Sequence, residues 1–166
     1  MDVFDSSSFA PAVDFGASAG NFIGVKQLDT SAVRWLEEFS QRVRDRNFEQ
    51  AKRLFDPQVI AFGTVSGRMS GLEPLVRKQW RKVWPRTQHF RFDLRTARAA
   101  RAGSLLVVCA AWKSRMADGG ARRRGRATLV LRRSGRKWLA IHTHFSAHPQ
   151  LNHDPVLHHP RASLHD

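Results

Sequence analysis

The sequence predicts one α+β domain, in which a curved antiparallel sheet carries helices on one of its faces. Two observations lead to this class. Apolar residues follow a helical period through most of the chain up to residue 84, and they follow the alternating period of strands from residue 89 onward. Helices and strands that segregate along a chain are typical of α+β domains. A chain of 166 residues is long enough for one such domain with a substantial core.

Two helices are predicted at the start of the domain. The first begins near Thr30 and Ser31, whose hydroxyls can cap its first turn, and its apolar residues recur at helical spacing as far as Val43. Asn47 separates it from a second, shorter helix. That helix stops before Pro57, because the residue ahead of a proline disfavours helical backbone.

A short strand and a third helix come next. Residues 59–62 form an apolar run closed by a glycine, which predicts a short strand. Ser70 and Glu73 have the spacing of a capping box. An apolar stripe at helical spacing runs from there to Pro85, where the helix must end.

Four strands are predicted to complete the sheet. Residues 89–95 alternate as in a half-buried strand, and residues 105–116 form a nearly continuous apolar run, which predicts a central strand. After a loop at residues 118–120, a hairpin occupies residues 125–146, with its turn at residues 134–135.

The last strand carries polar side chains on one predicted face. Alternation places His142, His144 and Ser146 on that face together with Trp138 and Ala140. Such a face is either the wall of a pocket or a solvated sheet surface. The opposite face is expected to carry Leu139, Ile141, Thr143 and Phe145.

The two ends of the chain are predicted to lie outside the domain. Residues 1–28 show neither period and indicate a flexible leader, and residues 150–166 form a tail rich in Pro and His. The acidic N-terminus lacks the features of a signal peptide, and no run approaches the ~20 apolar residues of a membrane span. We therefore expect a soluble, cytoplasmic protein.

The single cysteine, Cys109, lies in an apolar run and is expected to be a small core residue.

The positive charge is concentrated in the predicted sheet. The formal net charge is +14, and residues 91–137 hold fourteen Lys and Arg against two Asp. This excess indicates either a solvated sheet face with basic hairpin tips or a surface that binds a polyanion. The solvated face is the simpler interpretation, so nucleic acid is a partner that the charge allows but does not favour.

Four motifs occur in an order that is typical of a known family: Leu54-Phe55-Asp56-Pro57-x-Val59, Phe62-Gly63-Thr64, Gly71 ahead of the third helix, and Trp138…His142-x-His144-x-Ser146-x-x-Pro149. Their order and spacing resemble the SnoaL-like branch of the nuclear-transport-factor-2-like superfamily over residues 29–149, and the last motif is also similar to the end of the association (hub) domain of calcium/calmodulin-dependent protein kinase II. The resemblance implies a cone-like (cystatin-like) fold, with N-terminal helices on the concave face of the sheet around a central pocket.

The resemblance implies a pocket for a small, mostly apolar ligand. Five tryptophans suit a flat apolar ligand, although the same aromatic residues would equally fit a filled core. Arg126 and Thr128 share a face of the penultimate strand, and if that face is concave, Arg126 would clamp a carboxylate. Ser146 is a further candidate ligand contact. By analogy, the pocket would be lined by Phe62, Trp80, Trp84, Phe90, Trp112 and His144.

His142 and His144 are the candidate catalytic residues, because an imidazole with an unperturbed pKa of ~6.5 can act as general acid or base. Two imidazoles fall short of the three protein ligands of a catalytic zinc site, and nothing in the sequence places His89 beside them. We therefore expect neither a metal nor a cofactor.

The related isomerases hold an enolate with a Tyr, and this chain has no Tyr, so their mechanism is disfavoured. Asp93 is expected in a salt bridge.

These observations lead to one functional hypothesis and one alternative. The hypothesis is a pocket for a small, mostly apolar ligand that can bear an acid group, with lyase-, isomerase- or cyclase-type acid–base chemistry within the range of the family. The alternative is a non-catalytic module for oligomerisation or for binding a polyanion. In either case we expect a homodimer that forms through the open face of the sheet.

Overall fold

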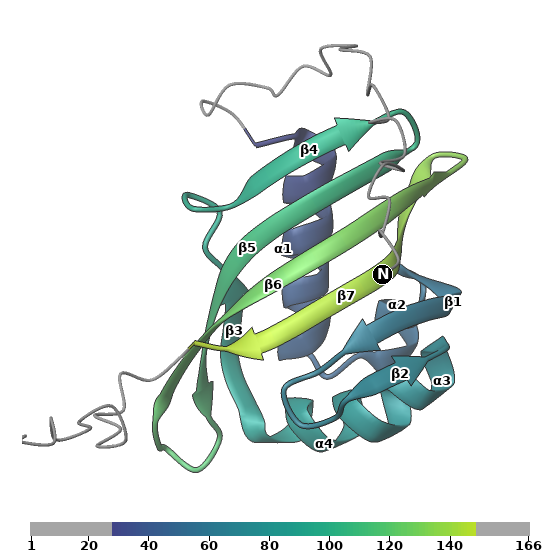
Figure 1. The fold of residues 1–166 in the computed structure, drawn as a ribbon. Coiled ribbons are helices and arrows are strands. Elements are labelled where there is room, and N and C mark those ends of the chain that lie inside the picture. Colours follow the sequence, from purple (N-terminus) through teal and green to yellow (C-terminus); the bar gives the residue numbers. More distant parts are fainter. Residues whose placement is uncertain (1–27, 149–166) are drawn as a thin grey trace, which may run out of the picture.

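The computed structural model describes residues 28–148. The predicted leader (residues 1–28, except Leu28) and tail (residues 150–166) lie outside the described residues. In the described part, a curved seven-stranded sheet wraps around helix α1, and short helical segments close one end (Figure 1). The elements are α1 Thr30–Arg44, α2 Phe48–Lys52, β1 Phe55–Phe62, β2 Arg68–Ser70, α3 Leu72–Leu75, the π-helical turn η1 Val76–Trp80, α4 Arg81–Val83, the 3₁₀ turn η2 Trp84–Arg86, β3 Thr87–Phe92, β4 Arg98–Ala102, β5 Leu105–Met116, β6 Arg122–Ser134 and β7 Lys137–Ala147.

Helix α1 forms where its apolar stripe predicts it, and that stripe is the buried centre of the domain. Its N-cap is Asp29, one residue earlier than predicted, because the Asp29 carboxylate accepts a hydrogen bond from the Ser31 amide at 2.8 Å. The side chain of Asn47 caps α2 in the same way. Helix α2 ends at Lys52, earlier than expected, and Phe55 already begins β1. The buried residues of α1 are Ala32, Trp35, Leu36, Phe39, Ser40 and Val43.

The third predicted helix is continuous through residue 83 but is not a regular α-helix. The predicted capping box is not formed: the N-cap is Gly71, at φ 92°, and no side chain caps the helix. A π-helical turn interrupts it at Val76–Trp80, and Pro85 closes it within a 3₁₀ turn, as expected. A π-helical turn re-aims side chains relative to a regular helix. Here its buried residues include Gln79 and Trp80.

The sheet is mixed, which corrects the prediction of a purely antiparallel sheet. The strand order is β2-β1-β7-β6-β5-β3, with β4 also pairing with β5. The last strands pair antiparallel as predicted, whereas β1 runs parallel to β7. The parallel pair joins the two ends of the domain, and no local pattern can reveal such a distant pairing. Strands β2 and β4 were also not predicted, because each is short and lies at a sheet edge.

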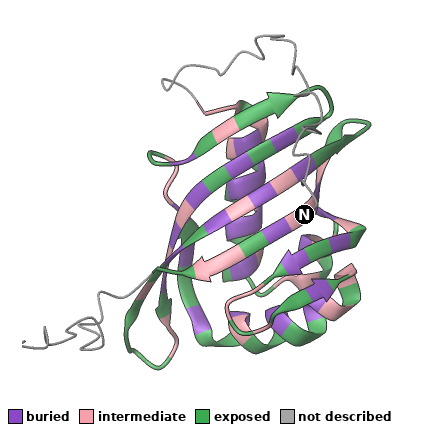
Figure 2. Cartoon of the chain, viewed as in Figure 1, coloured by how far each residue is buried: buried purple, intermediate pink, exposed green. Residues whose placement is uncertain are grey.

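A β-bulge in β7 decides which side chains of the last strand face inward. Leu131 pairs with Ala140, but Val130 pairs with His142, so Ile141 is an extra residue on the bulged strand. Ala140 therefore faces the core while His142 faces outward, and the prediction that they share a face is wrong. Buried and exposed residues alternate along the strands (Figure 2).

The outer face of the sheet also carries Cys109. It is exposed, so the prediction of a core residue is wrong. In β5, Leu106, Val108 and Ala110 are buried, and the residues between them face outward. A continuous apolar run thus conceals a regular alternation, since both faces of this strand are apolar.

Candidate functional site

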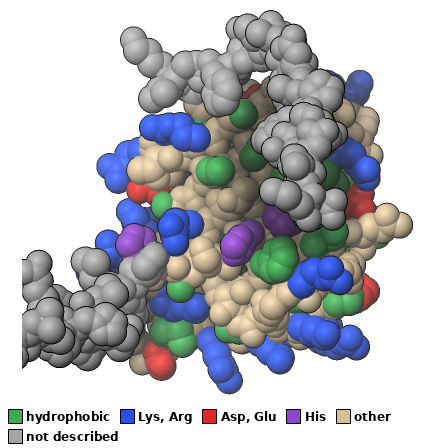
Figure 3. Space-filling view, viewed as in Figure 1, with side chains coloured by type: hydrophobic (Ala, Val, Ile, Leu, Met, Phe, Trp, Pro, Cys, Tyr) green, Lys and Arg blue, Asp and Glu red, His purple; other side chains and the backbone are tan. Residues whose placement is uncertain are grey.

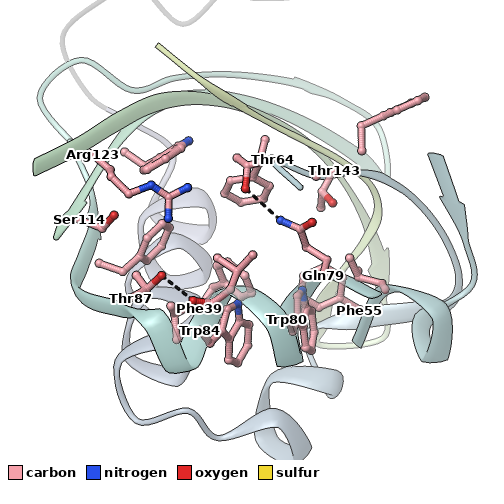
Figure 4. A pocket seen from close by; sticks show the side chains of 18 residues that line it. Phe39, Phe55, Thr64, Gln79, Trp80, Trp84, Thr87, Ser114, Arg123 and Thr143 are labelled. Atoms are coloured by element: carbon pink, nitrogen blue, oxygen red, sulfur yellow. Dashed lines mark hydrogen bonds between the residues drawn. The ribbon is translucent and has the colours of Figure 1, made fainter. Parts of the chain in front are cut away.

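The concave face of the sheet and the helices enclose an apolar pocket (Figure 4). Its cavity volume is about 60 Å³. Trp80 and Trp84 stack with ring centroids 4.6 Å apart, and both rings contact Phe39 of α1. The aromatic residues thus fill most of the hollow and leave a narrow opening. The aromatic lining consists of Phe39, Phe55, Phe62, Trp80, Trp84, Phe90, Trp112 and Phe145.

The predicted aromatic residues are placed at this pocket, with one qualification at Phe62. Trp80, Trp84, Phe90 and Trp112 are buried in its wall. Phe62 also lines the pocket, but its ring lies beside the imidazoles of His142 and His144, with centroids 6.0 and 5.6 Å apart. Phe62 therefore belongs to the rim.

The two candidate catalytic histidines lie on the outer face of the sheet, away from the pocket. The prediction that His144 faces the pocket is wrong: its side chain is exposed, and it pairs with Thr128 of β6. The paired residues Arg126 and Ser146 occupy the same outer face. The physical reason is that β6 turns its apolar residues inward, namely Ala127, Leu129 and Leu131, so the alternate positions must face outward.

Several polar groups line the pocket, and most of them already have partners. The Gln79 amide donates to Thr64 Oγ1 at 3.2 Å, and Thr87 Oγ1 donates to the Val83 carbonyl at 2.8 Å (Figure 4). Ser114 is different: its Oγ is buried and has no hydrogen-bond partner. A buried hydroxyl without a partner carries an energetic penalty that a bound polar group can relieve.

Arg123 is the ionisable residue of the pocket. It reaches in from β6 on the side of Ser114 and Thr87 (Figure 4). Its guanidinium lies 5.9 Å from the centre of the Trp112 ring, and Nη1 is 3.7 Å from Met116 Sδ. It forms no ion pair with any residue in the described part of the chain. Arg123 is not among the site residues predicted from the sequence, although counting back from Leu131 and Leu129 in steps of two places it on the inward face.

A basic hollow adjoins the pocket at the β5–β6 end of the sheet. Ser114 and Arg123 line both spaces, so the hollow and the pocket share one wall. Asp93 lies nearby, and hydrogen bonds from Arg95 and Lys113 lower its pKa. The salt bridge predicted for Asp93 is thereby confirmed. The hollow is lined by His89, Arg91, Lys113, Ser114, Arg115, Arg122, Arg123 and Arg124.

Two further observations concern groups within the described residues. No three His, Cys, Asp or Glu side chains between residues 28 and 148 gather closely enough to hold a metal ion. Within the same residues, no helix is long and apolar enough to cross a membrane.

A curved sheet that wraps around a long helix and closes over an apolar pocket defines a cone-shaped α+β domain. The chain belongs to the SnoaL-like domain family, whose pattern matches residues 33–149. The predicted resemblance is thereby confirmed, and so is the α+β class with N-terminal helices. A search of curated proteins finds no match to the chain.

Solved structures with the same fold carry several functional descriptions. One is a nuclear-transport-factor-2-like protein of unknown function from Pseudomonas putida, with 22% identity, a TM-score of 0.62, and coverage of 76% of this chain and 93% of that chain. Another, from Xanthomonas campestris, is proposed to be a calcium/calmodulin-dependent protein kinase II association domain. It has 18% identity and a TM-score of 0.63, and the match covers 72% of this chain and 87% of that chain. A third, from Streptomyces avermitilis, is proposed to be a dehydratase. It has 17% identity and a TM-score of 0.63, and the match covers 72% of this chain and 95% of that chain. At these identities the likeness establishes the fold alone.

Proposed function

We propose that this domain binds a small, mostly apolar molecule whose acidic group lies at Arg123. The observation that carries the proposal is the composition of the pocket: an aromatic wall with one ionisable side chain among the described residues that line it. Aromatic walls provide contact area for a flat apolar body. A guanidinium beside them provides bidentate hydrogen bonds for a carboxylate.

Arg123 and Ser114 together favour an anion over a neutral polar group. The guanidinium has no carboxylate partner among the described residues, and the Ser114 hydroxyl is buried without a partner. A carboxylate at this point would accept hydrogen bonds from both groups. The basic hollow next to them raises the local concentration of anions, because clustered cations at a concave surface focus the electric field.

The pocket favours binding without turnover. Acid–base chemistry of the lyase, isomerase or cyclase type needs a group that exchanges protons near neutral pH. Among the described residues, the lining contains no His, Asp, Glu, Cys, Lys or Tyr, and an arginine stays protonated. His142 and His144 lie on the other side of the sheet, so a catalytic role for them finds no support in the geometry of this pocket.

The test compares benzoate with the neutral isostere benzamide by isothermal titration calorimetry. We expect benzoate to bind more tightly to the wild-type protein and Arg123→Gln to remove that preference. Arg126→Gln is the matched control, because Arg126 lies on the same strand, is exposed on the outer face of the sheet, and lines neither the pocket nor the basic hollow. Equal affinity for both compounds in the wild type would contradict the proposal. If nucleic acid binds instead, with equal losses in both variants and steep salt dependence, the polyanion alternative is correct.

We also propose that the outer face of the sheet joins two copies of the chain. Five large apolar residues are exposed in the described part, and four of them lie on this face: Ile60, Phe62, Leu105 and Val107, which are 38–46% exposed. Hydrophobic side chains lie in separate spots on this face, some of them beside histidines, and most Lys and Arg lie toward its edges (Figure 3). An apolar patch with a charged rim is typical of an interface. Val107→Glu should convert a dimer to a monomer in sedimentation experiments, and a wild type that sediments as a monomer would refute this.

A further inference from the structure

We propose that a second site binds a compact anion with at least two phosphate groups, in a hollow at the opposite end of the sheet. We call this hollow the hairpin cleft. It lies between the start of α1, the end of α2, β4 and the β6–β7 hairpin, and its volume is about 500 Å³. Arg123 and Arg133 are ten residues apart along β6, roughly 33 Å at the rise of a strand. The cleft is therefore separate from the apolar pocket. Its cationic residues are Arg34, Arg53, Arg101, Arg133, Arg136 and Lys137.

The cations of the hairpin cleft are not balanced by carboxylates of the described chain. Glu38, the acidic residue of the lining, pairs with Arg42 outside it. Asp29 pairs with Arg101 at 2.6 Å. The other five cations form no ion pair with any residue between positions 28 and 148. Like charges gathered in one hollow repel each other, and a bound anion would relieve this repulsion.

One of these cations is held in a fixed position. The Arg101 guanidinium donates to the Asp29 carboxylate through Nε and Nη2, and it lies 4.7 Å from the centre of the Trp138 ring. A guanidinium that is already ordered loses less conformational entropy when a ligand arrives. Arg101 therefore provides a rigid donor at the edge of the hollow.

The size and charge of the cleft match a small molecule with several negative charges. Cations from four separate elements converge on one hollow, whereas a nucleic-acid strand follows a continuous basic track. A volume of about 500 Å³ is in the range of small-molecule sites. One guanidinium group can donate two parallel hydrogen bonds to two oxygens of a phosphate group. Five unpaired cations exceed what one carboxylate or monophosphate can neutralise, so a diphosphate unit, free or part of a nucleotide, is the chemistry that fits.

The experiment titrates the full chain with inorganic pyrophosphate, ATP and a single-stranded RNA by calorimetry at low salt. The test variant combines Arg34→Gln and Arg133→Gln. The control combines Arg77→Gln and Lys78→Gln, which removes the same charge from exposed positions outside the cleft. We expect pyrophosphate to bind at least about tenfold more weakly to the test variant and unchanged to the control. ATP that binds more tightly than pyrophosphate identifies a nucleotide as the source of the diphosphate.

Three results would overturn the inference: no binding of pyrophosphate or ATP at low salt, equal weakening in both double variants, or binding of RNA alone. The four positions substituted in the two double variants are exposed, so thermal unfolding should show that both double variants fold. Arg123→Gln should leave pyrophosphate affinity unchanged. Loss of benzoate binding in that variant, with pyrophosphate binding intact, would separate the two sites.

Discussion

Gly125→Ala provides a sharp test of how the pocket is built. Gly125 lies opposite Trp112 in the β5–β6 ladder. A Cβ at this position would lie well under 3.0 Å from the indole of Trp112 and from the Ser146 carbonyl. Trp112 is buried and donates its indole N–H to the Arg126 carbonyl at 3.2 Å. Because both neighbours are held in place, neither can move away without loss of contacts.

The magnitude follows from these contacts. Overpacking of a fitted core costs about 1–3 kcal/mol, and loss of the indole hydrogen bond adds about 1 kcal/mol. We expect the free energy of unfolding to fall by about 2–4 kcal/mol, which lowers Tm by roughly 10 °C in a domain of this size. Differential scanning calorimetry measures this change. Benzoate affinity should fall with it, because Trp112 forms a wall of the pocket.

Gly67→Ala is the matched control for this experiment. A Cβ at Gly67 meets no atom within 4 Å, so its Tm should stay within about 2 °C of the wild type. If Gly125→Ala unfolds at the wild-type temperature, then β6 does not pack against Trp112 as described, and the position of Arg123 in the pocket is wrong as well.

The remaining predictions concern the caps, the core and the histidines. Asp29→Ala should destabilise the domain by about 1 kcal/mol, because it removes the side chain that caps α1. Burial tends to raise the pKa of Asp29, but hydrogen bonds from Arg101 and Ser31 lower it overall. The stability that the ionised Asp29 contributes is therefore present at neutral pH, and it is lost as the pH falls through the folded-state pKa. Urea unfolding at pH 7 and pH 3 measures the difference. Leu129→Ala should cost about 2–5 kcal/mol, because Leu129 is fully buried, and an unchanged urea midpoint would contradict this. His144→Ala should leave benzoate affinity unchanged, as calorimetry can verify, and a large loss would place the ligand on the outer face.

Much of the fold could be predicted because its signals are local. The stripe of α1 and the alternation of the last strands require only neighbouring residues. The aromatic wall followed from the family resemblance, and the wall residues Trp80, Trp84, Phe90 and Trp112 do surround the pocket. The predicted polar residues His144, Arg126 and Ser146 lie instead on the outer face of the sheet.

The charged residue of the pocket illustrates this error. Arg126 and Arg123 belong to the same basic run, and alternation places them on opposite faces of β6. Leu129 and Leu131 mark the inward face, so the sequence contained the information that selects Arg123. Arg126 was predicted on the condition that its face of the strand is concave, and that face is the outer one. In β7, the bulge at Ile141 likewise places His142 and Ala140 on opposite faces.

The sequence by itself determined the α+β class, the helices that fill the cone, and the alternation that gives each strand a buried face, because those patterns depend on hydrophobic burial at regular spacing. Tertiary structure alone decided the parallel pairing of β1 with β7, the one-residue bulge in β7, and the gathering of cations from four elements in the hairpin cleft. Each of these depends on contacts between residues far apart in the chain. A single inserted residue reverses the face of every side chain beyond it, so only the partner strand can fix which side chains enter the pocket.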